Sequence, residues 1–292
     1  MKQSPQTSPV DFIGIGAPRC STTWLAACLA EHPEICFASE KEPHFFDRDY
    51  NYDQGLAYYR SFFERCAESQ LRGEFSPDYY RFPKAGARIA AHAPTAKLIM
   101  IVREPVSRAI SHAQYEFRRT GVRYSLGRLL AEDPAHPIIE NGRYHALLSA
   151  FLDAVGPLPL HVMSYDDCVC DPAGELARLY DFLGVDATFL PATLTRVVNA
   201  AGRTGYRSPF LNRLIMSRKW IKRHRLGYRA ITLLKRFGVN TLVKRIEAYN
   251  RRPGTRSEQL VVTDEERAQL RAYYADDVWK FADLTGLNLT TW

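Results

Sequence analysis

Short apolar runs alternate with segments of helical periodicity up to about residue 193 of the chain. The runs at residues 11–16 and 97–103 are almost entirely apolar between their end residues, which is typical of strands buried in a parallel sheet. Further strands are predicted at residues 71–75 and 158–163, and helices at residues 22–30, 105–119, 142–155 and 172–183. This alternation predicts an α/β fold, a parallel β-sheet flanked by helices.

The strand pattern ends after residue 193, and the pattern beyond it is helical. Residues 210–249 have the spacing of basic amphipathic helices. Thr263, followed by three acidic residues, marks a helix start, and this helix is predicted to reach about residue 274. A last helix is predicted at residues 278–284.

The whole chain is predicted to be one domain, because 292 residues with 46% hydrophobic content can bury one large core. We place that core at about residues 11–205 and a basic helical C-terminal extension at about residues 206–292. Residues 203–252 contain fifteen Lys or Arg and one acid, a charge of +14, whereas the rest of the chain carries −7. Such a block suggests an anionic partner (phosphates, an acidic glycan or a lipid surface), and the alternative is a solvated helical surface.

No stretch approaches the roughly 20 apolar residues of a membrane-spanning helix. Residues 1–10 lack the apolar region of a signal peptide. The cysteines show no zinc-site spacing and no dense framework, so we expect reduced thiols and a cytoplasmic protein; they are Cys20, Cys28, Cys36, Cys66, Cys168 and Cys170.

The segment Gly14-Ile-Gly-Ala-Pro-Arg-Cys-Ser-Thr-Thr23 joins the first predicted strand to the first predicted helix. Backbone N–H groups at a helix N-terminus carry partial positive charge, and Arg19 adds a full charge with a fork of donors. Hydroxyl donors come from Ser21, Thr22 and Thr23. These features favour an anion-binding loop, the alternative being an ordinary turn in which Ser21 or Thr22 caps the helix.

The same loop lacks the lysine of a Walker motif, since Arg19-Cys-Ser-Thr22 stands where Gly-Lys-Ser/Thr would be. That lysine and the hydroxyl beside it hold the γ-phosphate and magnesium in kinases and NTPases. The loop therefore suits a nucleotide that binds without a metal.

A second anion site is predicted at the end of the apolar run at residues 97–103. Arg103 ends the strand, and Ser111 lies two turns into the helix that follows. Ligands of open parallel sheets bind beyond the carboxyl ends of the strands, so two anion sites there suit a nucleotide with phosphates at two positions. The alternative is that Arg103 and Arg108 form surface ion pairs, for example with Glu104.

The two predicted anion sites resemble, in their order and spacing, the motifs with which sulfotransferases bind 3′-phosphoadenosine-5′-phosphosulfate (PAPS). Lys41-Glu-Pro-His-Phe-Phe-Asp47 resembles the signature of the heparan sulfate sulfotransferases, especially the 3-O-sulfotransferases. The likeness spans about residues 12–205 and includes the segments at residues 48–60, 73–79, 171–177 and 201–205. It implies a P-loop-like fold and transfer of a sulfuryl group from PAPS, a co-substrate used without a metal, to a hydroxyl or amine of an acceptor.

The resemblance also implies the site residues. The 5′-phosphosulfate would be held by Arg19, Cys20, Ser21, Thr22 and Thr23, and the 3′-phosphate by Arg103 and Ser111. A late loop against the same nucleotide would contain Gly202, Arg203 and Thr204. The family's catalytic positions fall on Glu42, His44 and Asp47, and Arg19 would also stabilise charge on the leaving group.

Glu42 is our first choice for the base that accepts the acceptor's proton. His44 is the alternative, because an imidazole titrates near neutral pH, and Asp47 would orient one of them or an acceptor hydroxyl. The alternative without a catalytic role, called here the bland interpretation, is that Lys41 and Glu42 form a solvated pair at a helix start and that His44 is packed between its neighbours. A group of aromatic residues either lines an acceptor groove or belongs to the core: Trp24, Tyr79, Tyr80 and Tyr144.

Three positions depart from the 3-O-sulfotransferase pattern, since Arg19, Phe75 and Ala201 stand where those enzymes carry Lys. Phe75 argues against a heavily sulfated, heparan-like acceptor. The cysteine pair and the N-terminal anchor of the Golgi enzymes are not seen, which suits a bacterial-type cytoplasmic enzyme.

The acceptor is predicted to be a carbohydrate. The first alternative is the same chemistry on a lipid or small natural product, with the basic helices in peripheral contact with an anionic membrane. The second is a non-catalytic anion- or glycan-binding protein, against which the retained Glu42, His44 and Asp47 argue. No nucleic-acid partner is predicted, and the sequence does not indicate an oligomeric state.

Overall fold

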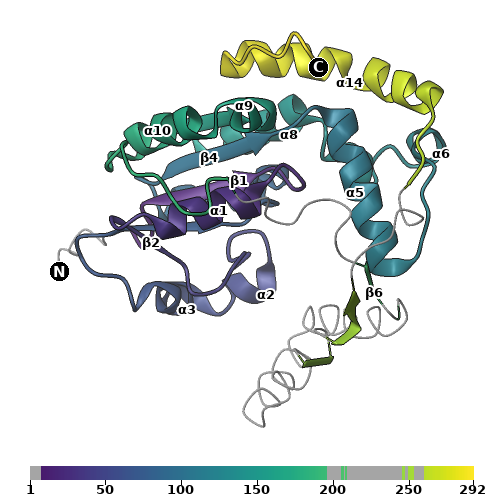
Figure 1. The fold of residues 1–292 in the computed structure, drawn as a ribbon. Coiled ribbons are helices and arrows are strands. Elements are labelled where there is room, and N and C mark those ends of the chain that lie inside the picture. The colour runs from purple at the N-terminus through teal and green to yellow at the C-terminus, as the bar shows by residue number, and fades with distance from the viewer. Residues whose placement is uncertain (1–7, 196–204, 207, 209–244, 247–248, 253–259) are drawn as a thin grey trace. The chain divides into compact units, whose positions relative to one another are not determined.

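The computed structural model describes residues 8–195, 205–206, 208, 245–246, 249–252 and 260–292 (Figure 1). The chain forms two compact units, one of residues 1–108, 141–198 and 272–292, the other of residues 109–140 and 199–271. The predicted helices at residues 210–249 lie almost entirely outside the described residues. The prediction of a single domain therefore stays a prediction.

The first unit is built on a parallel sheet of five strands in the order β2-β3-β1-β4-β5 (Figure 1). The strands are β1 (Phe12–Gly16), β2 (Ile35–Phe37), β3 (Leu71–Phe75), β4 (Lys97–Val102) and β5 (Leu160–Ser164). Four of them were predicted, and β2 is new. The chain runs from β1 toward one edge of the sheet and from β4 toward the other, so the β1–β4 junction is the switch point at which such sheets bind ligands.

The apolar runs are continuous because the central strands are covered on both faces. All five residues of β1 are buried, and in β4 only Lys97 is not fully buried. Gly14 allows a close approach at this centre, where a Cβ atom would lie 2.1 Å from the ring of Phe75. Phe75 itself is 3% exposed and belongs to the core.

The helices bear out the predicted pattern and add short elements to it. Asp171 caps α10 by accepting from the Gly174 N–H, and Gly184 ends the helix with a φ of 84°. The α-helices are α1 (Thr22–Glu31), α2 (Asp49–Tyr52), α3 (Gly55–Arg60), α4 (Pro83–His92), α5 (Pro105–Thr120), α6 (Leu126–Glu132), α7 (Pro137–Glu140), α8 (Tyr144–Val155), α9 (Tyr165–Cys170), α10 (Pro172–Leu183) and α14 (Asp264–Thr285). Two 3₁₀ turns, η1 (Ser61–Phe63) and η2 (Tyr79–Arg81), and an antiparallel pair, β6 (Gly205–Tyr206) with β7 (Arg251–Arg252), complete the described elements.

The prediction of two separate helices after Thr263 is wrong, because one helix, α14, runs without a break from Asp264 to Thr285. No Pro or Gly interrupts this stretch. Asp277, near the expected gap, faces α8 and accepts hydrogen bonds from the backbone N–H groups of His145 and Ala146 at 2.9 and 3.0 Å. Among the described residues, no helix is long and apolar enough to cross a membrane.

The expectation of reduced thiols is wrong for two cysteines, since Cys36 in β2 and Cys66 after η1 form a disulfide with their Cα atoms 5.5 Å apart. This pairing could not be predicted, because 30 positions separate the two cysteines and β2 was not expected. Their bond closes a ring that contains residues 41–47. Cys170 is an exposed free thiol, whereas Cys20, Cys28 and Cys168 are buried.

Reduction of the Cys36–Cys66 bond is expected to lower the free energy of unfolding by about 3–4 kcal/mol, because it frees a ring of about 30 residues in the unfolded chain. Urea denaturation with and without reductant measures the difference. Cys66→Ser should reproduce the loss, and Cys170→Ser, at an exposed free thiol, should not. Equal stability of oxidised and reduced protein would contradict the bond's contribution.

Candidate functional site

The loop of residues 17–21 joins the carboxyl end of β1 to the N-terminus of α1. Arg19 and Ser21 both have left-handed backbones, with φ of 74° and 63°. Ser21 is the N-cap residue of α1, but its side chain makes no capping hydrogen bond. The alternative of an ordinary capped turn is therefore not what the structure has. The first N–H groups of α1 are therefore left without a side-chain cap from Ser21 and are available to an anion.

Tyr144 at the start of α8 joins this loop to the end of β4. Its hydroxyl lies 3.6 Å from Cys20 Sγ, donates to the Arg103 carbonyl at 2.8 Å and accepts from the Arg103 N–H at 3.4 Å. The Ala17 N–H, in the same loop, donates to the carbonyl of Ile101 in β4 at 2.8 Å. The first predicted anion site and the Arg103 end of the second are thus brought together.

Cys20 reports the charge around the loop. Burial raises the pKa of its thiol to about 11, while the Tyr144 hydroxyl and then the positive charges of three arginines, Arg108, Arg103 and Arg19, act in the opposite direction. A buried thiol with this pKa stays protonated near neutral pH, so Cys20 fills space and does not act as a nucleophile. The arginines give the loop a positive field, as an anion site requires.

The alternative of surface ion pairs with Glu104 is not observed. The Glu104 carboxylate accepts from the N–H groups of Val106 and Ser107 at 3.0 and 2.7 Å and so caps α5. Arg108 is fully buried. The Arg103 guanidinium lies over the Tyr165 ring at 4.5 Å and takes part in no ion pair within the described part of the chain.

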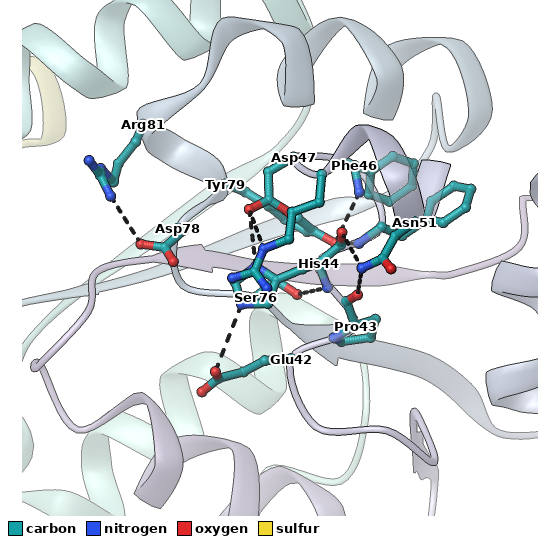
Figure 2. A network of polar contacts seen from close by, with 12 residues as sticks. Glu42, Pro43, His44, Phe46, Asp47, Asn51, Ser76, Asp78, Tyr79 and Arg81 are labelled. Atoms are coloured by element: carbon teal, nitrogen blue, oxygen red, sulfur yellow. Dashed lines mark hydrogen bonds and ion pairs between the residues drawn. The ribbon is translucent and has the colours of Figure 1, made fainter. Parts of the chain in front are cut away.

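The second part of the site is the loop of residues 41–47, between β2 and α2. Figure 2 shows the His44 ring between the carboxylates of Glu42 and Asp47. His44 Nδ1 lies 3.0 Å from Asp47 Oδ2, and His44 Nε2 lies 3.9 Å from Glu42 Oε2. A carboxylate only accepts, so Nδ1 donates to Asp47 and Nε2 faces Glu42. His44 and Asp47 are buried, whereas the Glu42 side chain is 37% exposed to solvent.

This loop has an unusual backbone. Glu42 and His44 have φ of 56° and 50°, in the left-handed region that residues with a side chain rarely adopt. The amide of Asn51 donates to the carbonyls of Pro43 and His44 at 2.9 and 3.0 Å, and Ser76 Oγ accepts from the His44 N–H at 3.0 Å (Figure 2). Arg19, Ser21, Glu42 and His44 are the non-glycine residues with positive φ in the described chain, and such residues gather at functional sites.

Lys41 connects the two parts. Its Nζ donates to Thr23 Oγ1 at 2.8 Å and lies 3.6 Å from Glu42 Oε1. The bland interpretation, a solvated Lys41–Glu42 pair, is thus incomplete, because Lys41 also reaches the first loop. Asp47 keeps a buried carboxylate oxygen, Oδ1, without a hydrogen-bond partner among the described residues.

Three sets of predicted residues contribute differently. The aromatic residues proposed for a groove are core: Trp24, Tyr79, Tyr80 and Tyr144 are all buried. Ser111 is half-buried on α5, in the part of that helix assigned to the second unit. Gly202, Arg203 and Thr204 lie outside the described residues.

Sequence reasoning missed Glu74, at the end of β3. Its carboxyl group is fully buried, and burial raises its pKa to about 7 even though the hydroxyls of Ser76, Tyr79 and Tyr59 donate to it and act the other way. The available signal was an acidic residue next to the last position of a predicted strand, between Gly73 and Phe75.

Comparison with known proteins agrees with this geometry. A model of the sulfotransferase domain matches residues 9–209. Human (Homo sapiens) heparan sulfate glucosamine 3-O-sulfotransferase 6 is 37% identical over 180 residues, 59% of this chain and 51% of that protein. Human heparan sulfate glucosamine 3-O-sulfotransferase 3B1 is 36% identical over 193 residues, 63% of this chain and 47% of that protein. The chain thus spans about half the length of these curated relatives.

The fold has a counterpart among solved structures. The crystal structure of a sulfotransferase from Alicyclobacillus acidocaldarius superposes with a TM-score of 0.66 at 20% identity, covering 97% of this chain and 98% of that one. The predicted parallel sheet with flanking helices is confirmed, as is the resemblance on which the site was predicted. With a domain match that extends over residues 9–209, the chain belongs to the sulfotransferase family.

Proposed function

We propose that the protein transfers the sulfuryl group of PAPS to a hydroxyl of a carbohydrate acceptor. The observation that carries this proposal is the bond from Lys41 to Thr23, which connects a carboxylate–imidazole–carboxylate set to a helix N-terminus whose loop lies in the positive field of three arginines. One part is suited to an anion and the other to removal of a proton.

The donor would lie at the carboxyl ends of β1 and β4. Arg19 and the loop through Cys20, Ser21, Thr22 and Thr23 would hold the 5′-phosphosulfate, and Arg103 and Ser111 the 3′-phosphate. Gly202, Arg203 and Thr204 are proposed to complete the nucleotide site. The whole chain would act as one sulfotransferase domain, and PAPS would bind to it without a metal.

Glu42 would act as the base. It accepts the hydroxyl proton as the acceptor oxygen forms a bond to sulfur, and the bond between sulfur and the bridging phosphate oxygen breaks, which leaves 3′-phosphoadenosine-5′-phosphate. His44 is oriented by Asp47 and lies next to Glu42, so it is the alternative base. Arg19 would stabilise the negative charge on the departing phosphate. The free Oδ1 of Asp47 is suited to accept from an acceptor hydroxyl.

A carbohydrate acceptor is favoured because the curated relatives are named for glucosamine 3-O-sulfation of heparan sulfate. Phe75 qualifies this likeness. Its ring is packed beside Gly14 in the core and offers no charge to a sulfated acceptor. We therefore propose an acceptor less anionic than heparan sulfate.

The two alternative functions are supported by different residues. Sulfation of a lipid or small natural product, with peripheral contact to an anionic membrane, rests on the basic residues at 203–252, which lie mostly outside the described residues. A non-catalytic binding protein would not need the aligned Glu42, His44 and Asp47.

The cytoplasmic placement rested on reduced thiols, and the Cys36–Cys66 disulfide favours an oxidising compartment instead.

The deciding experiment incubates the purified protein with PAPS and separate acceptors: a glucosamine-containing oligosaccharide, a lipid-linked alcohol and a phenolic small molecule. Mass spectrometry then looks for one added sulfuryl group, with and without a chelator. Sulfation of the oligosaccharide in both conditions supports the proposal. Binding of 3′-phosphoadenosine-5′-phosphate without transfer to any acceptor would favour the binding protein, and a need for magnesium would contradict the metal-free donor site.

Arg103→Ala is expected to weaken binding of 3′-phosphoadenosine-5′-phosphate by about 1.5–3 kcal/mol, the contribution of a hydrogen bond to a charged group. Calorimetry measures the affinity. Adenosine 5′-phosphosulfate, which lacks the 3′-phosphate, is the matched control and should bind the wild type and the variant nearly alike. An equal loss for both nucleotides would mean that Arg103 supports the fold and does not contact the 3′-phosphate.

A further inference from the structure

Beneath the loop of residues 41–47 lies a buried polar cluster around Glu74, to which the proposed chemistry assigns no part. Tyr59 and Tyr79 donate their hydroxyl protons to Glu74 Oε1 at 3.2 and 2.8 Å. Ser76 donates to Glu74 Oε2 at 2.8 Å. All four side chains are fully buried, so the carboxyl group exchanges its hydrogen bonds with water for three protein hydroxyls.

The hydroxyls of Ser76 and Tyr79 face two ways. Each hydroxyl has a single proton, which it uses for its hydrogen bond to Glu74. Its oxygen can therefore accept a hydrogen bond from another group. Ser76 Oγ accepts from the His44 N–H at 3.0 Å. Tyr79 Oη accepts from the Phe45 N–H at 2.9 Å and lies 3.4 Å from the Phe46 nitrogen (Figure 2).

While Glu74 is ionised, this arrangement fixes the direction of the three hydrogen bonds that it accepts. A hydroxyl that lacks an acceptor for its proton can rotate, and its lone pairs then leave the backbone amide they served. With Glu74 as the common acceptor, the lone pairs of Ser76 and Tyr79 stay aimed at three consecutive N–H groups, those of residues 44–46. These amides belong to the turn in which Glu42 and His44 adopt left-handed backbones.

We propose that Glu74 is a positioning residue that acts through Ser76 and Tyr79 to hold the backbone of residues 44–46, and thereby sets the geometry of Glu42 and His44. The inference rests on the proposed sulfuryl transfer. Glu74 does not touch the substrate, and its effect reaches the reacting atoms through two hydroxyls and the main chain. The Asn51 amide binds carbonyl groups of the same turn, those of Pro43 and His44. Side chains therefore bind both the N–H groups and the carbonyl groups of this loop.

Tyr59 supplies a matched control. Its hydroxyl bonds the same oxygen of Glu74 as Tyr79 does, but it makes no other hydrogen bond within the described chain, and its ring stacks on Phe45 with centroids 4.6 Å apart. Tyr59→Phe and Tyr79→Phe therefore remove the same kind of bond to Glu74 and keep both rings. Only Tyr79→Phe also removes the acceptor of the loop amides.

The test measures kcat and the KM for PAPS in both variants, and in Ser76→Ala, with thermal unfolding and nucleotide binding as checks of folding. Tyr79→Phe and Ser76→Ala should each lower kcat by about 10–100-fold, the effect of a misplaced catalytic group, with a KM for PAPS within about threefold of wild type. Tyr59→Phe should retain kcat within about threefold. Glu74→Gln should resemble Tyr79→Phe, because an amide cannot accept from hydroxyls on both of its ends.

Equal kcat values in Tyr59→Phe and Tyr79→Phe would overturn the inference, whether both fall or neither does. If Glu74→Gln does not fold, the pair of tyrosine variants and Ser76→Ala still decide. The proposed function fails separately, if the wild-type protein itself transfers no sulfuryl group to any acceptor. In that case the variants cannot differ in kcat, and they are expected to bind the nucleotide as the wild type does.

Discussion

Glu42→Gln is expected to lower the turnover number by about 10²–10⁴-fold, the usual effect of removing a general base. The Glu42 carboxylate is the exposed member of the set, 3.9 Å from His44 Nε2 and 3.6 Å from Lys41 Nζ, so it is the group that an incoming hydroxyl can reach. Gln keeps the shape and the hydrogen-bonding reach but cannot take the proton. Steady-state kinetics with PAPS and the acceptor found by mass spectrometry measure the loss.

Nucleotide affinity should be unchanged in Glu42→Gln, because the side chain is assigned to the acceptor. Glu40→Gln is the matched control, since Glu40 is an exposed carboxylate two residues earlier and should not affect turnover. Near-normal turnover in Glu42→Gln, together with a collapse in His44→Ala, would move the base to His44.

Arg19→Ala is expected to reduce kcat by about 10²–10³-fold, the range for loss of one group that stabilises charge in the transition state. Arg19 stands in the loop beside Cys20, whose thiol responds to its positive charge. The backbone there is left-handed, with a φ of 74°, and Ala and Arg both carry a Cβ atom, so the substitution tests the guanidinium and not the turn.

Arg19→Lys separates charge from geometry. The 3-O-sulfotransferases carry Lys at this position, so the variant should retain most of the turnover that Arg19→Ala loses. Single-turnover measurements at saturating PAPS distinguish a chemical defect from weak binding. An unchanged single-turnover rate in Arg19→Ala would show that the leaving group is stabilised by other residues.

Sequence reasoning was most reliable where local chemistry decides the structure. The helix predicted at residues 172–183 was expected to end at Gly184, and the structure has α10 at Pro172–Leu183. The buried strand β4 was equally clear from its apolar run. By contrast, β2 is three residues long and α2 is four, too short for a period to show.

The site divides in the same way. The loops that carry Arg19, Glu42 and Arg103 could be found because each follows a strand or a recognisable motif. Their contacts could not, since the Lys41–Thr23 and Cys20–Tyr144 contacts join residues 18 and 124 positions apart. Glu74 was missed for a related reason. A buried carboxyl group is tolerated only with partners, and its partners come from α3, η2 and the loop between β3 and η2.

The Cys36–Cys66 bond also changes the covalent topology of the loop of residues 41–47. Residues 53–55 are exposed within the ring that this bond closes, and a single backbone cleavage there would leave both new ends attached to the same molecule. The nicked protein would run as one chain until it was reduced. The segment that carries Glu42, His44 and Asp47 would remain tethered through β2, so one broken peptide bond would not release it from the sheet.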